Sequence, residues 1–305
     1  MRIERLSPAS YRDLIQPDRV HGSLYTEPYV FEDELDKIFS RGWVFVAHDS
    51  ELPEPGDYIT RTVGRQHYLV VRGQDGAVNV FINRCQHRGN LVCNKPAGNA
   101  RSFTCPYHGW TFGLNGELQD VPHATGFQKD WNKLGLEVPR SGSYRGFVFA
   151  SAAPDGITLD QHLGRAKELI DRACDLSPNG RLRLSAGWVR HQYGANWKML
   201  PENDTDGYHV GFTHQSFVRA IRSQYDQFVA DDTSANGVIR DWGDGHTEIA
   251  LADGYTKPPE WLVTSPHNAA DPVAAMETSA GKQPAAHLWL QSPPQAPPAP
   301  NSSPP

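Results

Sequence analysis

Short apolar runs rich in β-branched and aromatic residues dominate the chain between residues 43 and 152. Six runs are separated by turn signals such as PEPGD and GQDG, and each predicts a short β-strand. They are WVFVAH, YITRTV, HYLVVRG, AVNVFINR, SFTCPYH and FVFAS, at residues 43–48, 58–63, 67–73, 77–84, 102–108 and 147–151. Strands at this density predict a small, mostly antiparallel β-domain.

A helical period replaces this pattern on both sides of the β-rich region. In the leader, a helix is predicted within residues 28–43 because apolar side chains recur at helical spacing and acids stand early in the segment. The apolar positions are Phe31, Leu35, Ile38 and Phe39. A second apolar stripe predicts a helix at residues 158–175. Residues 181–193 favour a strand, and Asn196 is a candidate cap for a helix beginning near Trp197.

These patterns predict an α+β protein with four parts. A helical leader at 1–42 is expected to pack on the third part, and a small antiparallel β-domain occupies 43–152. A helix-on-sheet domain follows at 153–262. Ten of the 24 prolines lie within residues 263–305, which have no sustained apolar period. Such a segment buries too little apolar area to offset its ordering entropy, so we expect a disordered tail.

Composition narrows the class of protein. The chain has 305 residues, 29 Lys and Arg against 35 Asp and Glu, and a formal net charge of −6. No basic surface therefore favours nucleic acid or anionic lipid as a partner. The first ten residues lack the apolar core of a signal peptide, and no apolar run is long enough to span a membrane. Four cysteines in a chain of this length do not make a disulfide scaffold. Together these features lead us to expect a soluble cytoplasmic protein.

Two loops place a cysteine beside a histidine. Cys85 and His87 form C-x-H, and Cys105 and His108 form C-x-x-H after seventeen intervening residues. Two such loops provide a Cys₂His₂ site, which suits either zinc or a [2Fe–2S] cluster with two thiolates on one iron and two imidazoles on the other. Alternatively, all four are ordinary residues without a metal. Because both loops leave strands and contain turn residues, the pattern favours the cluster.

Two aromatic residues flank the second loop, and two further cysteines lie elsewhere in the chain. Tyr107 and Trp110 are expected to shield the site from water. Cys93 and Cys174 fall outside the pattern and are interpreted as structural thiols.

A second constellation is the sequence ENDTDGYHVGFTH. On a helix, Asp206 and His209 share a face, whereas His209 and His214 are about 140° apart. Convergence of the two imidazoles on one metal then needs a widened turn, and a π-bulge near Gly207 or Gly211 would supply it. Two histidines at this spacing are a weak motif alone, since most such pairs are ordinary core or surface residues.

Both constellations resemble signatures of one protein family. CQHRG and CPYHGW are similar to the signature of the Rieske iron–sulfur domain, and Asp206, His209 and His214 match the D-x-x-H-x₄-H pattern of Rieske oxygenases. The resemblance covers about residues 25–262. It is nearest to the large (alpha) subunits of aromatic-ring-hydroxylating dioxygenases of the benzoate, toluate and anthranilate type.

The resemblance implies roles for the individual residues. Cys85 and Cys105 would hold one iron of the cluster, and His87 and His108 the other. His209 and His214, with a distant aspartate, would bind mononuclear non-haem Fe(II). Asp206 would bridge this iron to His108 of the partner subunit.

The resemblance also implies a reaction and partners. The expected activity is dihydroxylation of an aromatic substrate, an aromatic acid in this branch, with O₂ in aromatic hydrocarbon catabolism. Electrons would come from an NAD(P)H-dependent reductase, sometimes through a ferredoxin. A homo-oligomeric ring is expected, in some members with a small beta subunit.

The sequence departs from the family after His214. In the family, the third iron ligand is a carboxylate far downstream, and no acid here has a comparable context. The remaining acids are Asp226, Asp231, Asp232, Asp241, Asp244, Glu248, Asp253 and Glu260. We therefore expect a catalytic domain truncated after about Leu262, without a third ligand. The competing interpretation is a short natural variant that uses an acid such as Asp271.

Three functions remain open from the sequence. The first is a terminal oxygenase, the second an impaired copy that acts at most as a Rieske electron-transfer protein, and the third a zinc-binding structural protein. Colour separates the third from the others, because a Rieske cluster absorbs visible light. Iron content separates the first two, with about three irons per chain against about two.

Overall fold

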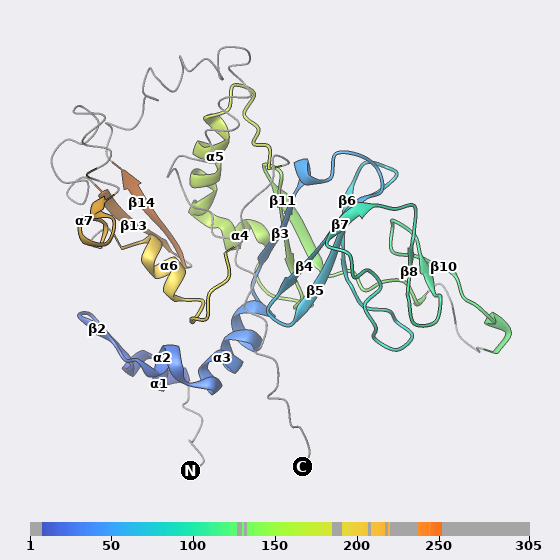
Figure 1. The fold of residues 1–305 in the computed structure, drawn as a ribbon, viewed down its shortest axis with the longest axis horizontal. Helices are drawn as coiled ribbons and strands as arrows, with labels where there is room; N and C mark the ends of the chain where they lie inside the picture. The colour runs from blue at the N-terminus through green and yellow to red at the C-terminus, as the bar shows by residue number, and fades with distance from the viewer. Residues whose placement is uncertain are drawn as a thin grey trace, which may run out of the picture.

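The computed structural model describes residues 8–126, 130, 133–184, 191–206, 209–216, 219, 237–243 and 245–251. It has the predicted α+β architecture, with a β-rich part at one side and helices with a hairpin at the other (Figure 1). Within these ranges, all paired strands are antiparallel. No described helix is long and apolar enough to cross a bilayer. The segment predicted as a disordered tail, 263–305, lies outside the described residues.

The β-rich part contains three sheets. Four strands are ordered β6-β5-β4-β7, three are ordered β10-β9-β8, and three are ordered β11-β12-β3. The bounds are β3 Val44–His48, β4 Asp57–Val63, β5 Gln66–Arg72, β6 Val78–Ile82, β7 Ala97–Asn99, β8 Phe103–Thr104, β9 Thr111–Phe112, β10 Leu118–Asp120, β11 Arg140–Tyr144 and β12 Phe147–Ser151. Single-turn 3₁₀ helices occupy Asp49–Glu51 and Ala124–Gly126.

All six predicted strands are present, and four further strands were not predicted. β7 is exposed throughout, β9 and β10 are two or three residues long, and β11 alternates between half-buried and exposed positions. These strands lack an apolar run. Their partners in the sheets determine their conformation, so a pattern of hydrophobic positions does not reveal them.

The leader contains α1 (Pro8–Asp13), a small hairpin of β1 (Ile15–Gln16) and β2 (Arg19–Val20), α2 (Ser23–Thr26) and α3 (Pro28–Glu34). The predicted helix begins at Pro28, but it widens into a π-helix at Leu35–Phe39, where the Ser40 N–H donates to the Leu35 carbonyl. Leu35 and Phe39 are buried in a core shared with the sheets, whereas Ile38 is 48% exposed. Ile38 is therefore not part of the core, contrary to the helical spacing.

The predicted helix at 158–175 is divided in two. α4 (Leu159–Leu163) is followed by a 3₁₀ turn and then by α5 (Lys167–Asp175). The break occurs at Gly164, whose φ of 43° is accessible to glycine at little cost. The strand predicted at 181–193 is absent from residues 181–184 and 191–193, and the intervening residues are outside the described part.

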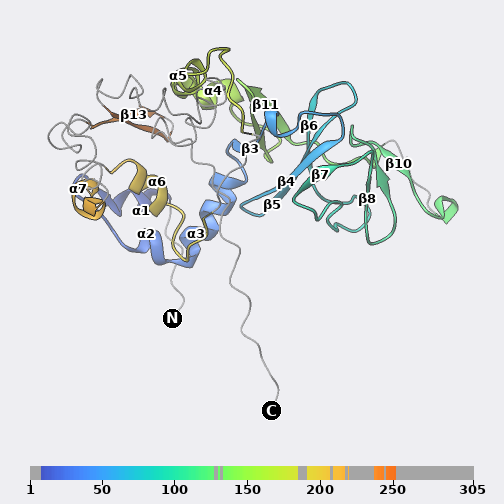
Figure 2. The same cartoon turned by 45° about the horizontal axis from the view of Figure 1, so that its top comes forward.

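The C-terminal part of the described chain carries α6 (Met199–Asp204), α7 (Val210–Thr213) and the hairpin of β13 (Gly237–Gly243) and β14 (His246–Leu251). Figures 1 and 2 place α6 and α7 between the leader helices and this hairpin. Asn196 caps the turn before α6, because its Oδ1 accepts the Lys198 N–H at 3.0 Å. The helix begins two residues later than predicted.

Candidate metal centres

The two cysteine–histidine loops have matching backbones. Cys85 and Cys105 each accept a hydrogen bond at their carbonyl from a glycine four residues later, Gly89 at 2.9 Å and Gly109 at 3.0 Å. Each cysteine N–H also donates to the carbonyl five residues later. Both glycines have positive φ, 73° and 74°, which β-carbon sterics disfavour in other residues. The same turn therefore presents a thiol and an imidazole twice.

The turns place like donors together. The thiol of Cys105 lies close enough to the Cys85 thiol to raise its pKa, and the rings of His87 and His108 lie 4.5 Å apart between centroids. This division into a thiol pair and an imidazole pair matches a cluster whose two irons take different ligands. Among the described residues, no three or more His, Cys, Asp or Glu side chains are grouped so that they could hold one metal ion. The donor set fits a [2Fe–2S] cluster.

Hydrogen bonds at the thiols suit a bound cluster. Burial raises the pKa of the Cys85 thiol, and the neighbouring Cys105 adds to this rise. Backbone N–H groups of His87 and Arg88 hydrogen-bond to the Cys85 sulfur and lower the pKa in opposition. Such donors favour the thiolate form and tune the potential of an iron–sulfur centre.

The site is buried at its cysteines and half-buried at both histidines. Trp110 is buried and stacks on His87, with centroids 4.9 Å apart and planes 7° from parallel. Tyr107 packs on His108 at 3.8 Å but is itself 55% exposed, and Arg88 lies over its outer face. Trp110 therefore shields the site as predicted, whereas Tyr107 forms part of the surface.

Asn83 supports the first loop and was not identified from the sequence. Its buried side chain accepts the N–H groups of Val92 and Cys93 at 3.1 and 2.9 Å and donates to the Cys93 carbonyl at 2.6 Å. It therefore joins the strand entering the loop to the chain leaving it. The available signal was a polar residue in an apolar strand, on the same face as Phe81.

The other two cysteines are not ligand candidates in the fold. All four cysteines are free thiols, Cys174 is fully buried far along the chain in α5, and Cys93 is half-buried. Cys93 faces Tyr58, whose pKa is raised by burial and by that thiol.

The second constellation brings its two histidines together. Nε2 of His209 lies 3.3 Å from Nε2 of His214, while Nδ1 of His209 lies 3.1 Å from Oδ2 of Asp206. A ring that bonds a carboxylate through one nitrogen directs the other toward a metal, which is a common arrangement of metal-binding histidines. The pair therefore fits as donors to one iron, with Asp206 behind it.

The local chain departs from an ideal helix at this point, and Gly211, one of the two places given for the predicted π-bulge, lies within the α-helical turn α7. α6 ends at Asp204 and α7 starts at Val210, so Asp206 and His209 lie between two short helices. The His209 carbonyl accepts the N–H groups of Phe212 and Thr213. Gly207 and Tyr208 are outside the described residues. The bulge near Gly207 therefore stays a prediction, while the rings of His209 and His214 approach each other although an ideal helix would hold them about 140° apart.

Few of the downstream acids fall within the described residues. Glu248 is buried and engaged elsewhere, accepting from Arg172 at 2.5 Å and from the Trp242 indole at 3.0 Å. Asp241 accepts the N–H of Gly243 in its own turn. The others named above, and Asp271, are outside the described part.

Two family models match the chain, and their ranges include the two constellations. Residues 42–132 match the Rieske [2Fe-2S] domain, and residues 181–292 match the ring hydroxylating alpha subunit (catalytic domain). The large subunit of 2-halobenzoate 1,2-dioxygenase from Burkholderia cepacia is 37% identical over 230 residues, 70% of this chain and 49% of the relative. The alpha subunit of toluate 1,2-dioxygenase from Pseudomonas putida is 35% identical over 243 residues, 78% and 53%.

A third relative is the large oxygenase component of a naphthalene 1,2-dioxygenase system from Ralstonia sp., 42% identical over 215 residues, 69% of this chain and 47% of the relative. Among solved structures, naphthalene 1,2-dioxygenase from Rhodococcus sp. bound to indole aligns with a TM-score of 0.71 and 31% identity, over 88% of this chain and 61% of that chain. The chain spans about half the length of the curated relatives it matches.

Proposed function

The chain belongs to the Rieske aromatic-ring-hydroxylating oxygenases, alpha (large) subunit, and from that premise we propose that it is an oxygenase component acting on an aromatic substrate with O₂. The family's cofactors are a [2Fe–2S] cluster, which carries single electrons, and a mononuclear non-haem iron, which activates O₂. The observation that carries the proposal is the pairing of thiol with thiol and imidazole with imidazole in the two loops.

The chain's own residues supply distinct parts of this function. Cys85, Cys105, His87 and His108 would hold the cluster, with Trp110 excluding water on one side. His209 and His214 would hold the mononuclear iron, and Asp206 would orient His209 through Nδ1. The domain limits that we propose remain those of the sequence pattern, 43–152 for the cluster and 153–262 for the mononuclear iron.

An aromatic acid is the substrate class that we propose. Relatives named for halobenzoate, toluate and anthranilate support it, with identities of 35–37%. Naphthalene dioxygenase components are comparably similar, so the test includes both classes. The proposed partners are an NAD(P)H-dependent reductase, with or without a ferredoxin, and further copies of the chain in a ring, with or without a small beta subunit.

Iron content and turnover test the function. A terminal oxygenase is expected to hold about three irons per chain and to oxidise benzoate-type acids faster than naphthalene when supplied with NADH and a reductase. About two irons and no turnover would instead support the electron-transfer function. Colourless protein that binds zinc would contradict both.

Replacing Asp206 by asparagine tests the proposal that this carboxylate bridges the mononuclear iron to His108 of the partner subunit. The amide oxygen of the substituted side chain can still accept from His209 Nδ1, so the iron content is expected to stay unchanged, whereas loss of the charge should lower turnover by about 10- to 100-fold. The measurement is turnover against iron per chain.

Asp204→Asn is the matched control, because this carboxylate on α6 faces Tyr193. It should behave as the unmodified protein. Full turnover by the Asp206→Asn protein would exclude the bridge.

A further inference from the structure

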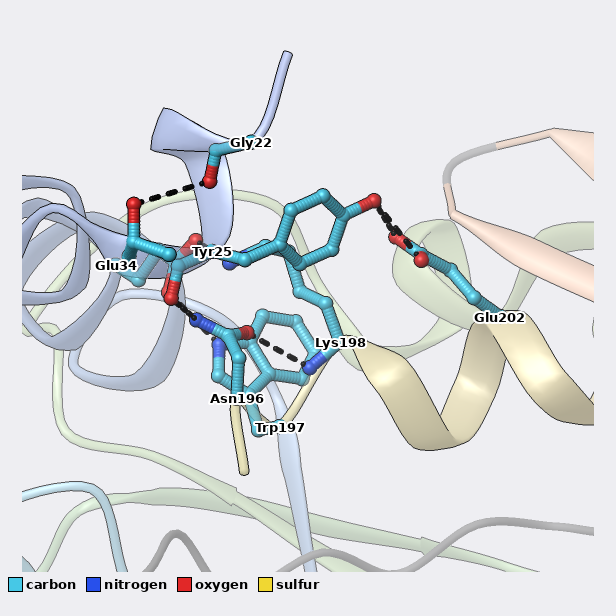
Figure 3. Close-up of polar contacts among 8 residues, drawn as sticks. Gly22, Tyr25, Glu34, Asn196, Trp197, Lys198 and Glu202 are labelled. Carbon is cyan, nitrogen blue, oxygen red and sulfur yellow. Dashed lines mark hydrogen bonds and ion pairs between the residues drawn. The ribbon is translucent and has the colours of Figure 1, made fainter. Parts of the chain in front are cut away.

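Hydrogen bonds join the leader to α6 and to the residues just before it. We call the residues that form them the leader clasp: Tyr25, Glu34, Asn196, Trp197, Lys198 and Glu202. Glu34 accepts hydrogen bonds from the Trp197 indole at 2.8 Å and from Lys198 Nζ at 2.5 Å. The Tyr25 hydroxyl donates to Glu202, and Asn196 Nδ2 donates to the Tyr25 carbonyl at 3.1 Å. Figure 3 shows these contacts reaching from the leader to Glu202 on α6 and to the residues before this helix.

Glu34 is the central and most buried member of the clasp. Its side chain is 10% exposed and that of Lys198 is 19% exposed. Removing either charge would therefore leave the other buried without a partner, which is destabilising. Trp197 is held from two sides, since its ring also meets Phe39 of the π-helix edge to face at 5.0 Å. Burial and Glu202 raise the pKa of Tyr25 to about 12, so its hydroxyl keeps the proton that it donates.

α6 depends on such external contacts for its position. It has six residues, includes Pro201 and ends in Asn203 and Asp204, all unfavourable for an isolated helix. The proline is tolerated because it stands in the first turn, where a backbone N–H has no helical partner. The clasp contacts both the residues before this helix and Glu202 within it.

The same helix leads directly to the proposed iron site. After Glu202, Thr205 Oγ1 donates to the Pro201 and Glu202 carbonyls, and the Asp206 N–H donates to the Asn203 carbonyl at 3.3 Å. Asp206 then meets His209 Nδ1. A displacement of α6 is therefore passed to Asp206 and His209 through a short hydrogen-bonded segment.

We infer that Glu34 is a positioning residue for the mononuclear metal site, acting through Trp197 and Lys198 on α6 and thereby on Asp206 and His209. The inference rests on the proposed function, because it assumes that His209 and His214 bind a metal. By this inference the leader helps to position the ligands of that site, beyond packing on the same domain.

Cobalt(II) binding to the full chain tests this inference. The protein is prepared with its [2Fe–2S] cluster retained and the mononuclear metal removed, and Co²⁺ is titrated while its visible d–d bands are recorded. Glu34→Gln is expected to weaken Co²⁺ binding by about tenfold or more and to change the band pattern, as loss of outer support does for other metal sites. The cluster's visible spectrum should be unchanged, which shows that the β-rich part remains folded.

Glu32→Gln is the matched control. Glu32 lies on the same leader helix, but it pairs with Arg65 of the β4–β5 turn and not with α6. Its replacement should leave Co²⁺ affinity and bands unchanged. Wild-type binding by Glu34→Gln, or equal weakening by Glu32→Gln, would overturn the inference.

A second variant covers the case in which Glu34→Gln does not fold. Tyr25→Phe removes only the hydroxyl bonded to Glu202, and a smaller loss of Co²⁺ affinity is expected; no change from it would also count against the inference. Failure of the proposed function would give a different result. In that case the unmodified chain would bind no Co²⁺, or its Co²⁺ binding would be unaffected by His209→Ala.

Discussion

Replacing Cys85 by serine is expected to abolish the visible absorption of the [2Fe–2S] cluster and remove about two irons per chain. Serine offers a hard, protonated oxygen where iron–sulfur chemistry needs a thiolate, and the turn cannot bring another sulfur to the same place. The fold should survive, since burying the new hydroxyl costs only about 1–3 kcal/mol. Absorption spectra and iron analysis after reconstitution with iron and sulfide provide the measurement.

Cys93→Ser is the control for this loss. Cys93 lies in the same part of the chain, eight residues later, but its thiol faces Tyr58 and the Lys95 carbonyl instead of Cys105. The Cys93→Ser protein should keep its colour and iron. A coloured Cys85→Ser protein with an unchanged spectrum would refute the ligand assignment.

Replacing His209 by alanine is expected to remove the mononuclear iron and lower turnover by more than about 100-fold, because it deletes a ligand where loss of outer support alone costs about 10- to 100-fold. The cluster should remain, since its ligands lie on the two loops of the β-rich part. Iron per chain, measured together with the cluster spectrum, separates the two effects.

A second histidine pair provides the control. The rings of His162 and His246 lie 5.2 Å apart, the same separation as His209 and His214. His246 Nε2, however, is already bonded to the His162 carbonyl at 2.8 Å, so this pair holds α4 to β14. His246→Ala should therefore keep all iron, and loss of iron from it would show that ring proximity alone does not identify the site.

The buried partner of Glu34 could not be predicted from the sequence pattern. At ideal helical spacing Glu34 shares a face with Phe31, and an acid on an apolar stripe is a signal of a buried partner. In the sequence pattern, the acids of this helix served only as a sign of its N-terminal end. The actual partner, Lys198, is 164 residues away, and no local pattern identifies it.

The sequence by itself determined the two ligand loops, the six apolar strands and the α+β class, because turn chemistry, β-alternation and helical period act over a few residues. Only the tertiary structure shows how the two loops meet, since Cys85 follows β6 and Cys105 lies between β8 and β9, which belong to separate sheets. It also decided the short strands β7 and β9 and the widening at Leu35–Phe39. These features depend on hydrogen bonds and packing between segments that are distant in the chain. Local preferences there are weak, and burial against a distant partner selects one conformation among several.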